Sequence, residues 1–361
     1  MKFLILRYYQ ERRIRLLKIC FTTFLFFGPV VGFSQDLCDF PADELGKKFP
    51  QAGMETMTSK YQEIRDSMPS MSDMTDEQMS SVMKSMGGDY YWPHSINEAD
   101  NAPGLLILAH GFGEEGDADL YNSLEDFSEI YQTTIAYGMS MMSSRHIECS
   151  LLEMDQAGDG KTYIVPVSAS PFNTLVRQWR YIFNLEDDYS YANVERVNSQ
   201  RAVFLEPIGD HPLVREIVLD FANEISSDPS NEVVLIVAHG PVSGEDNALQ
   251  LEMMENISSY LRANGRFLEV MPLTLQDDAS PEVRAANVQR MREFVSSRSY
   301  NGRDVLIVSN LMSGKGIQRR VERDLEGLTY SFNSNGVATH ALFREWIKVS
   351  IQESLGKSQM D

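Results

Sequence analysis

Cysteine is scarce in this 361-residue sequence, which contains three cysteines and no Cys-x-x-Cys spacing. The shortage excludes the usual cysteine-based zinc and redox motifs. Cys20 lies in the amino-terminal segment, so Cys38 and Cys149 remain as a possible disulfide of an oxidising compartment. A Gly-x-Ser-x-Gly nucleophile elbow is also missing, and the stretch 138–141, Gly-Met-Ser-Met, is a poor substitute for it.

Positive charge is in short supply as well. The chain has 32 Lys and Arg against 52 Asp and Glu, a formal net charge of −20. Residues 1–34 hold six of the basic residues and one acid, so removing their five net positive charges leaves about −25. Such an acidic surface repels phosphate backbones and anionic lipids, and it therefore argues against a nucleic-acid partner.

Long apolar runs are limited to one stretch near the amino terminus. A basic region through Lys18 precedes 15 apolar residues from Ile19 to Phe33, too short for a comfortable membrane span. Gly32 and Ser34 supply small residues at the positions that a signal peptidase prefers. We therefore expect 1–34 to be a signal peptide, the mature chain to begin near Gln35, and the protein to be periplasmic, with no membrane contact after cleavage. An uncleaved signal anchor is the alternative.

Residues 35–100 form a methionine-rich leader. The pattern favours a helical hairpin whose methionine stripe packs on the domain behind it. Thioether ligation of Cu(I) is the alternative, since clustered methionines in an exported protein suit that ion. The leader contains eight methionines between positions 54 and 86: Met54, Met57, Met68, Met71, Met74, Met79, Met83 and Met86.

The remaining chain contains one short sequence motif twice. Residues 105–111 read Leu-Leu-Ile-Leu-Ala-His-Gly, and residues 234–240 read Val-Leu-Ile-Val-Ala-His-Gly. An apolar run of this length followed by glycine is typical of a buried strand that ends in a sharp turn. His110 and His239 lie 129 positions apart, and so do His211 and His340. Two matched pairs at one offset indicate a duplicated domain.

We accordingly predict an α/β fold of two tandem domains, 101–226 and 231–356, related by a pseudo-twofold rotation. Each should be a four-stranded parallel sheet flanked by helices, because strands and helices alternate along the chain. The helix at 211–225 should close the first domain. The expected strands are one ending at His110 and those at 133–136, 164–167, 202–205, 233–237, 267–271 and 305–308. The expected helices are 118–131, 211–225, 247–263, 281–297 and 340–354.

The candidate site follows from the two strand-end histidines. Open α/β sheets bind ligands at the carboxyl ends of their strands, so His110 and His239 should converge on a cleft between the domains. Acidic residues follow each, notably Glu114 and Glu245. Histidine with carboxylate suits a divalent metal ion such as Co²⁺, Ni²⁺ or Zn²⁺. His211 and His340 are further candidate ligands, or else histidines partnered locally at a helix start.

These phrases resemble a known family. Leu106–Gly113 and Leu235–Val242 are similar to the first strand and His-Gly-Ser turn of the class II tetrapyrrole chelatases, the sirohydrochlorin cobaltochelatases and ferrochelatases. Glu206–His211 resembles the segment that opens that family's last helix, and Thr274–Glu282 its second strand and the proline-initiated helix after it. The resemblance covers about residues 103–355. It implies ATP-independent insertion of a divalent metal (Co²⁺, Ni²⁺ or Fe²⁺, with Co²⁺ foremost) into a tetrapyrrole, with His110 and His239 as catalytic residues and metal ligands.

The sequence departs from the family at one point. The family's second histidine, after the third strand, is missing at both 170–174 (Ser-Pro-Phe-Asn-Thr) and 313–317 (Ser-Gly-Lys-Gly-Ile). An alternative function is therefore a non-catalytic periplasmic protein that binds metal or tetrapyrrole on a chelatase scaffold. The stretch 109–113 also resembles the His-Gly oxyanion segment of α/β-hydrolases, but the missing nucleophile elbow disfavours that class.

Overall fold

The computed structural model describes residues 38–50, 57–95, 102–157, 160–313 and 316–358. The chain divides into two compact units, Met1–Pro41 and Ala42–Asp361. In the first, the Phe40 N–H donates to the Cys38 carbonyl at 3.1 Å, and the segment expected to be a signal peptide lies outside the described residues. Cys38 and Cys149 are both disulfide-bonded, as the sequence allowed. Among the described helices, none has the length and apolar character that a membrane span requires.

The first sheet contains five strands in the order β1-β3-β2-β4-β5. Strands β2 to β5 are parallel, whereas β1 runs antiparallel to β3. The expectation of four strands was therefore short by one: β1 comes from the segment assigned to the leader and extends the sheet at its edge. The strands are β1 (Tyr90–Ser95), β2 (Gly104–Ala109), β3 (Gln132–Tyr137), β4 (Thr162–Pro166) and β5 (Ala202–Phe204).

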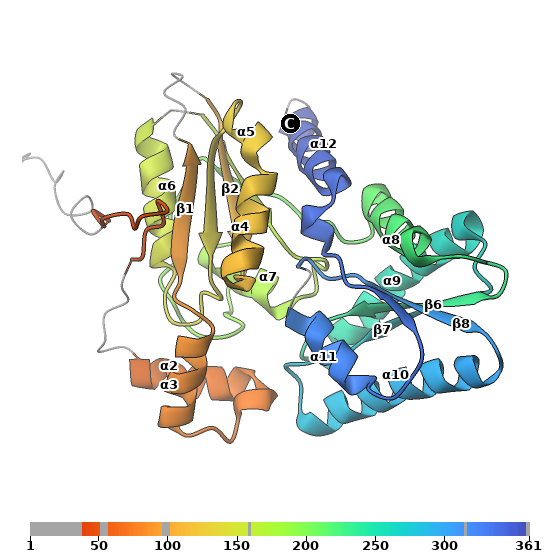
Figure 1. Cartoon of the computed structure of the whole chain (residues 1–361). Helices are drawn as coiled ribbons and strands as arrows, with labels where there is room; N and C mark the ends of the chain where they lie inside the picture. The colour runs from red at the N-terminus through yellow and green to blue at the C-terminus, as the bar shows by residue number, and fades with distance from the viewer. Residues whose placement is uncertain (1–37, 51–56, 96–101, 158–159, 314–315, 359–361) are drawn as a thin grey trace, which may run out of the picture. The chain divides into compact units, whose positions relative to one another are not determined.

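The second sheet contains four parallel strands in the order β7-β6-β8-β9. This order matches β3-β2-β4-β5 strand for strand, so β2 and β6 occupy the same central position in their sheets. The predicted α/β class, with parallel sheets flanked by helices, is confirmed (Figure 1). The strands are β6 (Glu232–Ala238), β7 (Glu269–Thr274), β8 (Asp304–Ser309) and β9 (Ser331–Asn333).

Helices connect the strands in both halves. The start of α10 follows local capping chemistry: Ser280 accepts a hydrogen bond from the Val283 N–H, and Pro281 takes the first helical position. The helices are α4 (Gly113–Ser123), α5 (Glu125–Ser128), α6 (Arg145–Ala157), α7 (Thr174–Ile182), α8 (Pro212–Ile225), α9 (Gly244–Gly265), α10 (Pro281–Tyr300), α11 (Gly316–Asp324) and α12 (Ala341–Ser358), with a 3₁₀ turn η3 (Val337–Thr339) before the last.

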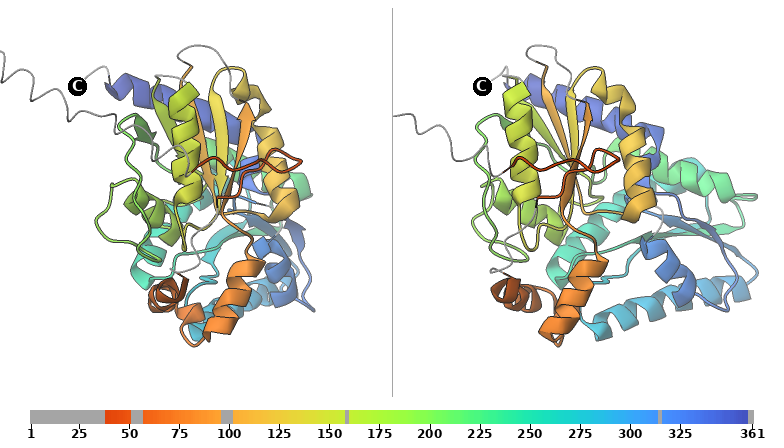
Figure 2. Two further views of the ribbon diagram at one scale, coloured as in Figure 1. Left: turned by 90° about the vertical axis from the view of Figure 1, so that its left-hand side faces the viewer. Right: turned by 60° about the vertical axis from the view of Figure 1, so that its left-hand side comes forward.

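Helix α8 packs mainly on the second sheet. Its buried stripe of Val214, Ile217, Val218 and Phe221 lies against β8, β9 and α9, and the Asn333 side chain of β9 donates to the Phe221 carbonyl at 2.9 Å. The expectation that this helix closes the first domain is thus corrected. The last helix, α12, lies beside α5 of the first half in Figures 1 and 2, with Lys348 Nζ 5.8 Å from the Phe127 ring centre.

Both central strands are buried along their whole length. One face of β6 (Val234, Ile236, Ala238) joins a core that also includes the β2 residues Leu105 and Ile107. The other face packs in a separate core with α10 and α11. Burial on both faces explains why the sequences of these strands are continuous apolar runs. It also fixes the position of the carboxyl end of each strand and of the residue that follows it.

The leader forms a hairpin of α2 (Met57–Ser67), the 3₁₀ turn η2 (Pro69–Met71) and α3 (Asp76–Ser85). Met68, Met71 and Met79 are buried, whereas Met54 lies outside the described residues. The Ser70 N–H donates to the Asp278 carbonyl at 3.4 Å. The hairpin therefore reaches the loop that follows β7.

Candidate functional site

His110 and His239 follow the central strands β2 and β6 directly. Each precedes a glycine in the left-handed region, Gly111 with φ 90° and Gly240 with φ 80°. A Cβ at Gly240 would lie 2.8 Å from the Thr274 Cβ, so the turn requires glycine there. Each histidine thus occupies the same position relative to the central strand and the glycine turn of its own sheet.

The two histidines are electrostatic neighbours. Burial among protein atoms, followed by the proximity of His239, lowers the pKa of His110 to about 4, and the carboxylate of Asp278 acts in the opposite direction. The His110 side chain is nevertheless accessible to solvent, and its ring meets the Phe112 ring edge-on at 4.7 Å. His110 is therefore an imidazole that stays neutral at ordinary pH and remains reachable from outside.

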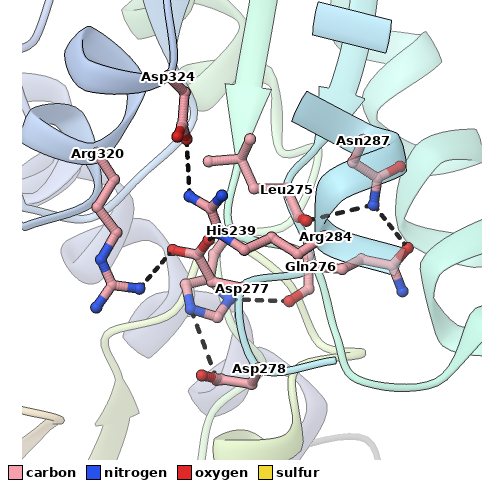
Figure 3. Close-up of polar contacts among 10 residues, drawn as sticks. His239, Leu275, Gln276, Asp277, Asp278, Arg284, Asn287, Arg320 and Asp324 are labelled. Carbon is pink, nitrogen blue, oxygen red and sulfur yellow. Dashed lines mark hydrogen bonds and ion pairs between the residues drawn. The ribbon is translucent and has the colours of Figure 1, made fainter. Parts of the chain in front are cut away.

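His239 has a carboxylate partner. Its Nδ1 lies 2.9 Å from the Gly240 carbonyl, to which it donates, and its Nε2 lies 3.6 Å from Asp278 Oδ2 (Figure 3). In a neutral imidazole with this tautomer Nε2 carries the lone pair. The Nε2 lone pair and the Asp278 oxygen repel each other unless a proton or a metal cation lies between them. The pair is about 30% exposed, so a ligand can reach it.

The predicted acids do not join this cluster. Glu114 and Glu245 are exposed in the first turns of α4 and α9. Throughout the described part of the chain, no three His, Cys, Asp or Glu side chains are arranged to hold a metal ion. The carboxylate that accompanies the histidines is Asp278, a residue the sequence analysis had placed in a motif but not in the site.

His211 and His340 have local roles. Nδ1 of His211 accepts a hydrogen bond from the Leu213 N–H at 3.2 Å, and Nδ1 of His340 accepts one from the Leu342 N–H at 3.2 Å. The former caps α8 and the latter stands at the start of α12. The identical geometry agrees with the repeat offset, and the locally partnered alternative is the one the structure supports.

The loop after β4, where the resembled family has its second histidine, is filled by a serine turn. Ser168 Oγ donates to the Ser170 carbonyl at 2.9 Å, and the Phe172 N–H donates to Ser170 Oγ at 3.2 Å. Asn173 then caps α7. In the corresponding loop after β8, residues 314–315 lie outside the described residues. The described part of the site therefore offers His110, His239 and Asp278 as its reactive groups.

Asp278 was missed because it is distant in sequence from both histidines. It follows β7, whose carboxyl end lies beside that of β6 because Ala238 pairs with Thr274. Two consecutive acids between the predicted strand at 267–271 and the predicted helix at 281–297 were the available signal. The predicted strand, 267–271, ended three residues early, which hid their place at the sheet edge.

No protein-family model and no curated protein matches the sequence. Among solved structures, SirB from Bacillus subtilis with Fe³⁺ is similar, with a TM-score of 0.51 and 16% identity over 72% of this chain and 98% of that one. The fold is chelatase-like. DR2241 from Deinococcus radiodurans, described as a multi-domain protein with structural similarity to chelatases, matches at a TM-score of 0.44 and 16% identity over 69% of this chain and 55% of that one.

Proposed function

We propose that the protein binds a divalent metal ion at the strand ends marked by His110 and His239, with Asp278 beside His239, and inserts the ion into a tetrapyrrole. The proposal rests on the equivalent placement of the two histidines and on the carboxylate beside one of them. Two sheets of the same strand order place a histidine after each central strand, and one of the histidines faces a carboxylate 3.6 Å away. A duplicated chelatase origin of the two halves accounts for this arrangement.

The two histidines suit different steps. Insertion requires a base that removes the pyrrole N–H protons and a ligand that holds the incoming metal. His239 suits the base, because Asp278 beside its Nε2 stabilises the imidazolium that forms. His110 suits the ligand, because its lowered pKa keeps the imidazole neutral and only neutral imidazole ligates metal.

The donor atoms at the site restrict which metal ions it would bind. Imidazole nitrogen with one carboxylate oxygen suits Fe²⁺, Co²⁺ or Ni²⁺ better than Mg²⁺ or Ca²⁺. Co²⁺ is our first candidate on the family resemblance, and Fe²⁺ stands beside it because the similar SirB structure carries Fe³⁺. The metal and the tetrapyrrole are both substrates in this scheme.

A non-catalytic metal- or tetrapyrrole-binding protein is the second candidate. It is favoured by the serine turn that fills the loop after β4, where a second histidine would add a ligand. Sirohydrochlorin with Co²⁺ or Fe²⁺ separates the two functions by absorbance. Metal insertion over many turnovers supports a chelatase, whereas a spectral shift that saturates at one equivalent supports a binder. Insertion that persists unchanged in both His110→Ala and His239→Ala would contradict the proposed site.

We further propose export to the periplasm, on the basic and apolar character of residues 1–34. Disulfides persist in oxidising compartments, so the disulfide-bonded state of Cys38 and Cys149 is compatible with that location.

A further inference from the structure

Asp277, the neighbour of Asp278, is held by two arginines. Its side chain has no exposed surface. Arg284 Nε donates to Oδ1 at 2.7 Å and Arg320 Nη1 donates to Oδ2 at 2.9 Å (Figure 3). A carboxylate withdrawn from water in this way is stable only while its charge is compensated.

Arg284 also binds a second acid. Its Nη2 donates to Asp324 Oδ2 at 2.7 Å, so one guanidinium joins the loop after β7 to the end of α11. The two arginines and two aspartates together carry no net charge. Removing either arginine would leave a buried carboxylate with half its partners and one uncompensated negative charge.

The same loop is fixed to His239 through the backbone. The Gln276 N–H donates to the His239 carbonyl at 2.6 Å, and Gln276 Nε2 donates to the Pro241 carbonyl at 3.1 Å. Gln276 holds a left-handed φ of 51°, a conformation that a residue with a side chain keeps only where its surroundings enforce it. Asp277 therefore anchors one side of a turn whose other side touches His239.

We propose that Asp277, Arg284 and Arg320 form a positioning brace that holds the Asp278 carboxylate against His239 Nε2, an inference that rests on the proposed function. The brace gathers the elements that follow three adjacent strands: His239 after β6, Asp277 and Asp278 after β7, and α11 after β8. None of the three brace residues needs to touch the metal. They act by fixing the Asp278 carboxylate beside His239.

The contacts predict which substitutions matter. Arg320 gives Asp277 a single hydrogen bond, and its side chain is 48% exposed. A lysine can replace that bond, so Arg320→Lys should behave like the wild type. Arg284 spans two carboxylates with separate edges of its guanidinium. A lysine has no such fork, so Arg284→Lys should fail where Arg320→Lys succeeds.

The test measures Co²⁺ affinity by calorimetry on the purified protein. Loss of an outer-shell partner typically weakens metal binding about 10–100-fold, and we expect that loss for Arg284→Gln, Arg284→Lys and Arg320→Gln. Arg290→Gln, an exposed position on the same helix α10, is the matched control and should bind as the wild type does. Circular dichroism verifies the fold of each variant. Should Arg284→Gln fail to fold, the Co²⁺ affinity of Arg320→Gln provides the test. Equal affinity across all these variants would overturn the brace.

A crystal structure of Arg284→Gln separates the brace from the proposed function. If His110→Ala left Co²⁺ affinity unchanged, the proposed function would fail by itself, because His110 is the proposed metal ligand. The crystal structure then still tests the brace: displacement of Asp278 Oδ2 from His239 Nε2 supports it, and a retained contact near 3.6 Å overturns it.

Discussion

Single residues of the same type have diverged in role within this chain. Four histidines share one repeat offset, yet two end central strands and two stand at helix starts. Sequence spacing identified both pairs but could not separate them, because the N–H groups that His211 and His340 engage belong to their own helices. That local partnering becomes visible only once the helix boundaries are known.

Replacing either helix-start histidine should affect stability and not metal binding. His211→Ala and His340→Ala each remove a side-chain acceptor from an unpaired helical N–H, which should lower the free energy of unfolding by about 1 kcal/mol. Urea denaturation measures the loss, and Co²⁺ calorimetry on the same variants should match the wild type. A weakened Co²⁺ affinity in either variant would show that the replaced histidine contributes to the metal site.

His110 should titrate below the ordinary histidine range. Its pKa is lowered by burial and by the neighbouring His239, so protons should compete with a metal at this residue only well below pH 6.5. Proton NMR of the His110 ring follows the titration directly. A midpoint at or above 6.5 would show that His110 is not the neutral ligand assigned here.

At the scale of elements, β1 is attached to the first sheet by more than its ladder. Asp89, just before β1, accepts hydrogen bonds from the Ser140 and Met139 N–H groups after β3, and a Cβ at Gly138 would lie 1.9 Å from its Oδ1. Burial raises the pKa of Asp89 to about 7. The carboxyl group of the folded protein is therefore mainly protonated below about pH 7.

This preference gives a definite pH dependence. The folded state binds the Asp89 proton more tightly than the unfolded state, whose pKa is near 3.8. The resulting stability is complete below pH 3.8 and is lost as pH rises through about 7. Asp89→Asn should remove this component, so the difference in unfolding free energy between pH 5 and pH 8 should shrink. Urea denaturation at both pH values checks it, and an unchanged difference would refute the assignment.

The helices show where sequence reasoning reached its limit. The stripe of α8 predicts a buried face, but periodicity does not say which sheet receives that face. Helix α8 lies against β8 and β9 of the second sheet. By contrast, Ser280 and Pro281 fixed the start of α10 correctly, because capping depends on residues adjacent in sequence. Asp278 needed the pairing of β6 with β7 to be known.

At the scale of the whole molecule, the periplasmic localisation of the protein is a prediction. The basic and apolar character of residues 1–34 predicts cleavage near Gln35. Mass spectrometry of the protein purified from its native cell should find that amino terminus in the soluble extract of the periplasm. An intact segment in the membrane fraction would favour the signal anchor.

The central claim is that two equivalent strand ends form one metal site. Anomalous diffraction from a crystal soaked in Co²⁺ tests it most directly. We expect one cobalt peak within bonding distance, about 2.0–2.2 Å, of an imidazole nitrogen of His110 or His239 and adjacent to Asp278. A peak at the methionines of the leader hairpin, or at His211 or His340, with none at the strand ends would contradict the account.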